Sequence, residues 1–531
     1  MSAPTSTEMA LPALWRRIIL AVLALLALGV GLFRIDRPAP WVDEAVTVLV
    51  VRRPWGGIPP LLQGADAPLV PYYLLAKAWA SMLSWLPTLV AVRTLSAVAA
   101  ALTVAALFTI VARLNGVLAG SLAAVILTSL AGFSRYAQEA RPYALLIMTS
   151  TLAWLAWEAW RRPQPGAFRQ PSGWRRELGR AAAYLVSLIG SVLFHLFGLF
   201  QWPAQLLADL VLPGRPRAER VRRAFSSAVT MVVAAVLVGV PLVFAATRGT
   251  GAPRLVPMTP RQLLADFGMT LDANNQVRPA LVVLALVLLA VVAVAARARV
   301  ARRYSRLVAI AVIWVVVPLV LSVAAAAVRP ALLRARYWMP LVVPMSALAA
   351  VGLLVLAGWT WRAVLRGGGR RTLAAVAASL VVVVPLAVHT ALQAPAHLSI
   401  RRAGGHALSL APALEKLDGL LAEEPDLPVA TTPYTRTTIL WAARPDLIAP
   451  DPLFRLDERG TEVWPKARDA ADVAQRLKGH NTMLWVRARI AAAGTVPTPK
   501  PTTPPKALQQ LGFTVVSAER AGSWWVCILQ R

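Results

Sequence analysis

The sequence is short of cysteine, histidine and charged residues. Cys527 is the only cysteine among 531 residues, so no disulfide bond can form within the chain. The five histidines are scattered, and no group of them has the spacing of a metal site. Charged residues make up only 15% of the chain, against about 25% in soluble proteins. These shortages exclude a disulfide scaffold and predict that no metal or other cofactor is bound.

Apolar residues, by contrast, make up 57% of the chain, and the mean hydropathy is +0.60. Soluble proteins contain about 45–50% apolar residues, so we expect an integral, multi-pass protein of the cell membrane. The net charge of +30 comes from 55 basic and 25 acidic residues. The arginines stand between apolar runs, as the positive-inside rule requires of membrane loops. We therefore expect membrane lipids as partners, and no nucleic acid.

Eleven apolar runs are long enough to cross a bilayer, which takes about 17–25 residues. They lie at residues 14–35, 92–112, 117–132, 142–160, 180–195, 197–212, 225–247, 279–296, 307–328, 338–360 and 372–392. The run from Val70 to Leu86 is ambiguous. If it crossed the membrane, every later loop would change sides, and the arginine clusters would face outward against the positive-inside rule. We predict that it lies at the outer surface or dips into it.

This topology places the N-terminus inside and the C-terminal segment outside. We expect a transmembrane domain at 1–392 and a small extracytoplasmic α/β domain at 393–531, which holds 13 of the 25 acidic residues. The C-terminal segment contains strand-like runs at Thr482–Val486 and Phe513–Val516. The proline-rich stretch Val496–Pro505 predicts a loop.

Acidic residues of the membrane region gather on the loops predicted to lie outside. Asp43 and Glu44 follow Trp41 at the end of the first span, and Asp66 lies further along the same loop. Burial there could raise the pKa of a carboxylate toward the range of a general base. Adjacent side chains diverge, so one of Asp43 and Glu44 would be the base while the other orients the loop or pairs with an arginine. The alternative is interfacial anchoring by Trp41, with both acids in water.

The second outside loop contains Arg135, Glu139 and Arg141, followed by Pro142, which suits the first turn of a helix. Arg141 would then lie beside the unpaired amides of a helix N-terminus, where anions bind. The alternative is a loop arginine paired with Glu139.

His195 and the pair Arg336-Tyr337 lie at the outer ends of later spans. A guanidinium fork beside a phenol can hold a phosphate. A histidine at the same depth could join them. The alternatives are a packing histidine on an apolar helix and an arginine that anchors the span at the interface.

These motifs occur in one order and spacing. They are Asp43-Glu44; Asp66-x-Pro-Leu followed by Tyr72-Tyr73-Leu74-Leu75; Arg135-Tyr-Ala-Gln-Glu-Ala-Arg141-Pro-Tyr143; His195-x-x-Gly198; and Arg336-Tyr337-x-x-Pro340. The set resembles the GT-C glycosyltransferases of the protein O-mannosyltransferase and aminoarabinose transferase type, especially the actinobacterial mannosyltransferase-like members. The resemblance covers roughly residues 15–390. Many relatives have His or Lys before the Pro-Leu-Tyr segment, where this chain has Asp66-Ala67-Pro68, and this departure bears on the acceptor more than on the fold.

The resemblance implies a GT-C fold of about eleven transmembrane helices and an inverting glycosyltransferase. The donor would be a polyprenyl-phosphate sugar, most simply mannose, and the acceptor a cell-envelope glycolipid, lipoglycan or protein on the outer face. By analogy, Asp43 is the general base. A polyprenyl monophosphate is a good leaving group, so the reaction would need no metal. The residues implied to bind the donor phosphate are Arg336, Tyr337, His195 and Arg141. Those implied to position the acceptor or the loops are Glu44, Asp66, Tyr72, Glu139 and Arg135.

Three alternatives stay open. One is a non-enzymatic structural scaffold of the envelope, which would not need an outer pocket of acids and arginines. An arabinofuranosyltransferase would use the same chemistry with a polyprenyl-phosphate arabinose donor. A lipid-sugar transporter or flippase would need polar residues along several spans, and here the spans are nearly all Ala, Val and Leu.

Overall fold

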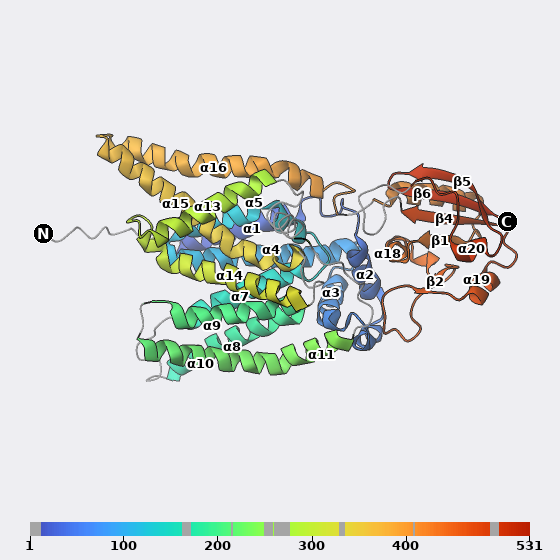
Figure 1. Cartoon of the computed structure of the whole chain (residues 1–531), viewed down its shortest axis with the longest axis horizontal. Coiled ribbons are helices and arrows are strands. Elements are labelled where there is room, and N and C mark those ends of the chain that lie inside the picture. Colours follow the sequence, from blue (N-terminus) through green and yellow to red (C-terminus); the bar gives the residue numbers. More distant parts are fainter. Residues whose placement is uncertain are drawn as a thin grey trace.

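The computed structural model describes residues 12–161, 171–213, 216–248, 259, 277–328, 335–406, 409–488 and 499–531. Figure 1 shows a long helical bundle with a smaller strand-containing domain at one end. The helix α16 runs along the bundle and ends beside this C-terminal domain.

A helix lies at each of the predicted spans. The bundle helices are α1 (Ala13–Leu32), α4 (Thr88–Asn115), α5 (Val117–Ser129), α7 (Tyr143–Trp160), α8 (Pro171–Phe194), α9 (Gln201–Val211), α10 (Arg217–Ala234), α11 (Val240–Arg248), α13 (Val277–Ala295), α14 (Ser305–Val328), α15 (Val342–Arg366) and α16 (Arg371–Ile400). A π-helical turn at Ala235–Gly239 joins α10 to α11. Within the described residues, seven helices are long and apolar enough to cross a membrane. The number eleven stays a prediction, because α5 and α9 are short.

The centre of the bundle is formed by α4 and α15, whose apolar segments are mostly buried inside the protein. Small residues let the neighbouring helices approach closely. At Gly352 on α15, an added Cβ would lie 2.3 Å from the carbonyl oxygen of Leu286 on α13, so only glycine fits this crossing. The bundle therefore packs by backbone proximity as well as by side-chain contact.

Short elements lie between the bundle and the C-terminal domain (Figure 1). They are α2 (Val42–Arg52), η1 (Trp55–Gly57), η2 (Pro59–Gln63), η3 (Ala67–Leu69) and α3 (Val70–Met82), while α6 (Ala131–Tyr136) packs on α5 and α16 in the bundle. The ambiguous run at 70–86 forms α3, a helix of 13 residues that packs on α2 and α4 and is too short to span a bilayer. This agrees with its predicted place at one surface.

The C-terminal domain contains a four-stranded sheet in the order β1-β4-β6-β5, with β1 parallel to β4 and the other pairs antiparallel. Its elements are α17 (Ala411–Glu423), β1 (Val429–Thr432), α18 (Tyr434–Ala443), η11 (Pro445–Leu447), β2 (Phe454–Arg455), β3 (Lys466–Ala467), α19 (Ala470–Arg476), β4 (Thr482–Ala488), α20 (Lys506–Gln509), β5 (Thr514–Ala521) and β6 (Trp524–Gln530). The strands β4 and β5 match the two predicted strand-like runs. Residues 499–505 form neither helix nor strand, as predicted, while 496–498 lie outside the described residues.

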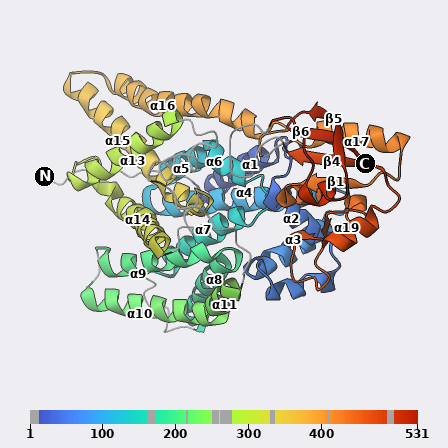
Figure 2. The same cartoon turned by 45° about the vertical axis from the view of Figure 1, so that its right-hand side comes forward.

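The membrane region and the C-terminal domain share an apolar core. Ala45 and Val48 on α2 pack with Ile439 and Leu440 on α18, and Figure 2 shows α2 against this domain. The last bundle helix, α16, continues to Ile400, beyond the boundary expected at residue 392. The C-terminal domain is therefore held against the bundle rather than tethered to it.

We predict that the C-terminal domain and the loop after α3 face outward, while the loop after α15 faces the cytoplasm. Cysteines introduced for the exposed residues Trp85 and Asp426 should react with an impermeant maleimide on intact cells, and a cysteine at Arg366 should react only after permeabilisation. The native Cys527 is buried and should add little background. If Arg366→Cys were labelled on intact cells while Asp426→Cys was protected, the orientation would be the opposite of the one predicted.

Candidate active site

The loop after the first span leads into α2, and this helix places Asp43 and Glu44 in its first turn. The backbone N–H of Trp41 donates to Glu44 Oε2 at 3.4 Å, and this contact pairs one of the amides left open at the start of the helix. Carboxylates at a helix N-terminus also interact favourably with the positive end of the helix dipole. The sequence therefore sets both acids at a defined point after the first span.

Glu44 points into the protein and forms a bidentate ion pair with Arg93 of α4, at 2.9 Å and 2.8 Å. Both side chains have zero exposure. The amide of Ala140 donates to Glu44 Oε1 at 2.8 Å, and His406 lies 3.7 Å from Oε2. Burial by itself raises the pKa of Glu44, but Arg93 and His406 outweigh it and hold the pKa well below its ordinary value. Glu44 is therefore the loop-fixing member of the acidic pair.

Asp43 faces the opposite way and lies between two arginines. Its Oδ2 is 3.6 Å from Arg141 Nη2 and 4.0 Å from Arg336 Nη1, and its side chain is 21% exposed. Both distances exceed those of a hydrogen bond, about 2.7–3.2 Å. The carboxylate is thus held by charge without being locked to either cation, and it stays accessible.

Arg336 lies among aromatic rings. Its guanidinium carbon is 5.5 Å from the ring centre of Trp41, 5.9 Å from Tyr143 and 5.6 Å from Tyr337. Burial lowers the pKa of Arg336, but Tyr143, Tyr337 and Asp43 together raise it above its ordinary value, so the side chain stays charged. Its Nε has no hydrogen-bond partner among the described residues.

Arg141 comes just before α7 and is buried, with Nη1 3.5 Å from the hydroxyl of Tyr73. Burial opposes its charge, but Asp43 and Tyr73 raise the pKa of Arg141 well above its ordinary value. The alternative pairing with Glu139 is wrong. Glu139 Oε1 accepts from Arg135 Nε at 3.1 Å, because the turn after α6 brings Glu139 back to the last turn of that helix, where Arg135 lies.

Glu139 and Arg135 form a second loop-fixing pair beside the first. Glu139 is buried, and its backbone oxygen accepts from the hydroxyl of Ser96 on α4 at 2.6 Å. Burial is the largest cause that raises the pKa of Glu139. This pair positions the loop that carries Arg141, and among the described residues it makes no hydrogen bond or ion pair with Asp43.

His195 is not on a helix, which corrects the expectation of a histidine within an apolar span. Its backbone is extended, it lies between α8 and η5 (Leu196–Phe200), and its Nδ1 accepts from the amide of Phe197 at 3.2 Å. The turn is tight, because a Cβ on Gly198 would lie 2.2 Å from the Ser191 carbonyl oxygen. The ring centre is 4.7 Å from that of Tyr337. The sequence His195-x-x-Gly198 therefore forms a turn that directs the imidazole ring toward Tyr337, next to Arg336.

The imidazole of His195 is neutral. Burial, together with Arg336 and Arg141, lowers its pKa to about 3. Because Nδ1 accepts a hydrogen bond, the proton is on Nε2. His195 can therefore donate a hydrogen bond to a bound anion, but it adds no charge.

Asp66 lies on the other side of Asp43, near the C-terminal domain. Burial raises its pKa to about 6; Arg141 opposes this rise, while Asp43 and Glu462 add to it. Its Oδ2 is buried without a hydrogen-bond partner among the described residues. Tyr72, by contrast, is fully buried against Tyr73, with ring centres 5.8 Å apart, and packs the base of the site.

A loop of the C-terminal domain completes this side. Arg53 donates to the backbone oxygens of Gly460 and Glu462 at 2.9 Å and 2.8 Å. A Cβ on Gly64 would lie 1.9 Å from the Thr461 carbonyl oxygen, so the two loops touch. Sequence reasoning missed Arg53 and Glu462, because they are hundreds of positions apart. It also missed Arg93, whose one visible signal is a charge inside an apolar run.

Metal-ligand groups are absent from the part of the chain that the structure describes: no three His, Cys, Asp or Glu side chains gather there. The charged groups around Asp43 are instead two guanidinium groups and one further carboxylate. This set suits an anionic ligand beside a general base.

The sequence matches no family model and no curated protein. Among solved structures, the apo form of ArnT from Cupriavidus metallidurans is similar, with 13% identity, a TM-score of 0.59 and 97% of both chains covered. The same protein bound to undecaprenyl phosphate gives a TM-score of 0.55 with 97% and 98% covered, again at 13% identity. Archaeal oligosaccharyltransferase AglB from Archaeoglobus fulgidus, in complex with an inhibitory peptide and a dolichol-phosphate, gives 0.50 at 13% identity, with 89% of this chain and 69% of AglB covered. Both are GT-C glycosyltransferases, so this chain has the expected GT-C fold.

We predict that Asp66→Asn stabilises the protein at neutral pH. The folded-state pKa of about 6 exceeds the ordinary 3.8, so the unfolded chain loses its proton first and stability falls as pH rises between these values. Removing this ionisable group should therefore raise the free energy of unfolding at pH 7.5 by about 3 kcal/mol. Thermal unfolding of the purified proteins at pH 7.5 should show a higher midpoint temperature for the variant than for the parent protein. At pH 4 the gap between the two midpoints should be smaller. The exposed Asp36→Asn is the control; a gap that is the same at both pH values would contradict the burial of Asp66.

Proposed function

We propose that this chain is an inverting glycosyltransferase that uses a polyprenyl-phosphate sugar. The sugar is most simply mannose, and the acceptor is a cell-envelope glycolipid, lipoglycan or protein on the outer face of the membrane. The observation that carries the proposal is the Asp43 carboxylate between Arg141 and Arg336, at 3.6 Å and 4.0 Å. The GT-C fold and a structural neighbour bound to undecaprenyl phosphate support it.

In the proposed reaction, an acceptor hydroxyl attacks the anomeric carbon of the donor sugar as Asp43 takes its proton. The bond from that carbon to the phosphate oxygen breaks, and the electron pair leaves with the polyprenyl phosphate. One displacement inverts the anomeric centre. The proton ends on Asp43, which becomes neutral, and the additional negative charge ends on the leaving phosphate. The total charge is therefore unchanged by the reaction.

The charge on the leaving phosphate calls for cations. Arg141 and Arg336 can turn toward a phosphate, because neither makes a short hydrogen bond to Asp43. The free Nε–H of each, unpartnered among the described residues, adds a donor. Tyr337 and the Nε2–H of neutral His195 supply further hydrogen bonds. Because the leaving group is a phosphate held by two guanidinium groups, the proposed reaction uses no metal.

A polyprenyl-phosphate arabinose donor is the alternative, and the similarity to ArnT, an aminoarabinose transferase, favours keeping it. The two readings differ only in the sugar. Purified protein should be incubated with a membrane extract and radiolabelled polyprenyl-phosphate mannose or arabinose in parallel. A labelled product from one donor alone identifies the sugar, while a transporter would make no new product from either.

We predict that Asp43→Asn lowers the transfer rate about 10²-fold or more, the usual scale for loss of a general base. The amide keeps the shape of the side chain but cannot take the proton, so donor binding should be largely retained. Initial rates with the labelled donor measure the effect. Asp36→Asn, an exposed acid on the same loop, is the matched control and should keep its activity. Near-normal turnover of Asp43→Asn would remove Asp43 as the base.

We also predict that Arg336→Ala weakens donor binding about tenfold or more, because a charge-assisted hydrogen bond contributes about 1.5–3 kcal/mol. Equilibrium binding of labelled donor to the purified variant tests this directly. Arg37→Ala removes an exposed arginine of the outer loop and should leave affinity unchanged. An unaltered donor affinity in Arg336→Ala would take this arginine out of the donor site.

A further inference from the structure

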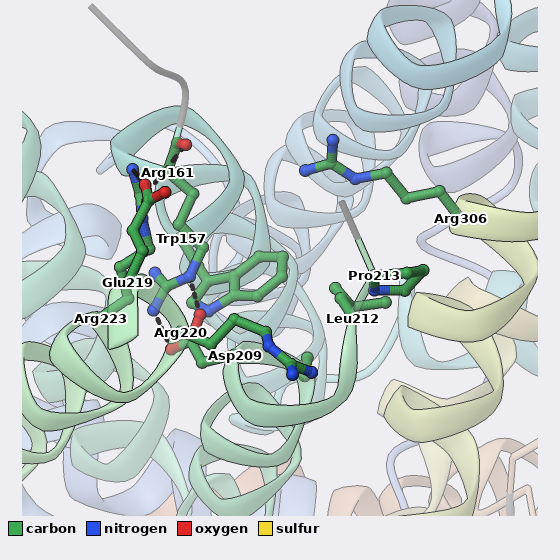
Figure 3. Close-up of a pocket in the computed structure, with 10 residues that line it drawn as sticks. Trp157, Arg161, Asp209, Leu212, Pro213, Glu219, Arg220, Arg223 and Arg306 are labelled. Atoms are coloured by element: carbon green, nitrogen blue, oxygen red, sulfur yellow. Dashed lines mark hydrogen bonds and ion pairs between the residues drawn. The ribbon is translucent and has the colours of Figure 1, made fainter. Parts of the chain in front are cut away.

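A polar pocket, whose lining residues Figure 3 shows, lies at the end of α7 that is away from the candidate active site. The helix α7 starts at Tyr143 in the candidate active site and ends at Trp160, just before Arg161 in this pocket. Its 18 residues cover about 27 Å at 1.5 Å per residue, close to the hydrocarbon thickness of a bilayer. The two sites therefore lie at opposite ends of α7, which the predicted topology assigns to opposite surfaces of the membrane.

The pocket has a volume of about 410 Å³ and lies between the ends of α7, α9, α10 and the start of α14. Its charged lining residues are Arg161, Arg220, Arg223, Arg306, Asp209 and Glu219. Four arginines face two carboxylates, so the lining carries a net charge of +2. An anion is the ligand that this balance favours.

Two of the arginines already have carboxylate partners. Arg161 forms a bidentate pair with Asp209 and donates to the hydroxyl of Ser227 at 2.6 Å. Arg223 lies 3.0 Å from Glu219. These pairs build the wall of the pocket and neutralise both acids.

The other two arginines carry the excess charge. Arg220 donates from Nη1 to the Leu210 carbonyl oxygen at 2.8 Å, while its buried Nε has no partner within the described residues. Arg306, in the first turn of α14, is exposed and makes no hydrogen bond or ion pair with any residue that the structure describes. In Figure 3 its guanidinium extends from α14 toward the remaining lining residues. Both side chains thus offer donors without acceptors.

The surface beside the pocket is apolar. On α10, the helix that supplies Arg220 and Arg223, Val221 is 52% exposed and Phe225 is 70% exposed. Val229 and Val232 continue this exposed face away from the pocket. A lipid whose headgroup reached the arginines could lay its acyl chains along these residues, whereas a free phosphate would make no use of them.

We propose that this pocket binds the phosphate of an anionic phospholipid headgroup, with Arg220 and Arg306 as its ligands. Basic pockets between helices at the cytoplasmic side recognise such headgroups, and the proposed topology places this end in the inner leaflet. The site is distinct from the one at Asp43 and does not depend on the proposed transfer reaction.

The experiment measures lipid binding to the purified full-length protein in neutral detergent. Phosphatidylglycerol is titrated and followed by native mass spectrometry, with phosphatidylcholine and inorganic phosphate as parallel probes. We expect saturable binding of phosphatidylglycerol that is about tenfold or more weaker in Arg220→Gln/Arg306→Gln, because charge-assisted hydrogen bonds are lost. The single variant Arg306→Gln changes only an exposed side chain, so it tests the site even if the double variant is unstable.

A matched control removes the same charge at the same end of the bundle. Arg366 and Arg371 are exposed and do not line the pocket, so Arg366→Gln/Arg371→Gln should bind phosphatidylglycerol like the parent protein. Equal weakening in both pairs would mean a general charge effect and would overturn the site. Unchanged binding in the pocket variants would also overturn it, and phosphate that displaces the lipid at equal concentration would show an inorganic-anion site instead.

Discussion

The buried ion pair between Glu44 and Arg93 is the interaction on which the end of the bundle next to the C-terminal domain depends. Arg93 also donates to the backbone oxygens of Ile35 and Pro38 at 2.9 Å and 2.8 Å. It thereby joins the end of the first span, the start of α2 and the central helix α4. Removing one partner of such a pair typically costs about 3–5 kcal/mol, because the other charge stays buried. Asp43 is the next residue along α2, so its direction is set by a contact that it does not make itself.

The C-terminal domain takes part in the same construction. His406 leads from α16 into this domain and lies 3.7 Å from Glu44, while Arg53 binds the loop at Gly460 and Glu462. The shared apolar core between α2 and α18 adds a third connection. The candidate active site is therefore closed on one side by a domain whose sequence shows no recognisable motif for it. A contact between loops that are far apart in the sequence cannot be predicted from a local sequence pattern.

Local patterns were sufficient where the chemistry is local. Hydropathy located the helices, because a bilayer imposes a length and an apolar composition on each. Motif order placed Asp43, Arg141 and Arg336 together. In the structure, a guanidinium nitrogen of each arginine lies within 4.0 Å of Asp43 Oδ2. Patterns failed for the partners of Glu139 and for the backbone of His195, because both depend on turns that tertiary packing decides. The partners of Arg93 could not be predicted for a related reason: they are residues more than forty positions away in the sequence.

The charged groups around Asp43 are of both signs. Arg141 and Arg336 lie 3.6 Å and 4.0 Å from its Oδ2, while Asp66 and Glu462 add negative charge nearby. A phosphate is attracted by the two guanidinium groups and repelled by the carboxylates, so the proposed donor would place its phosphate at the arginines. An acceptor hydroxyl is neutral and can approach Asp43 past the carboxylates. In the proposed reaction, holding the phosphate at the cations while the hydroxyl meets Asp43 favours the opposed directions of attack and departure that an inverting displacement requires.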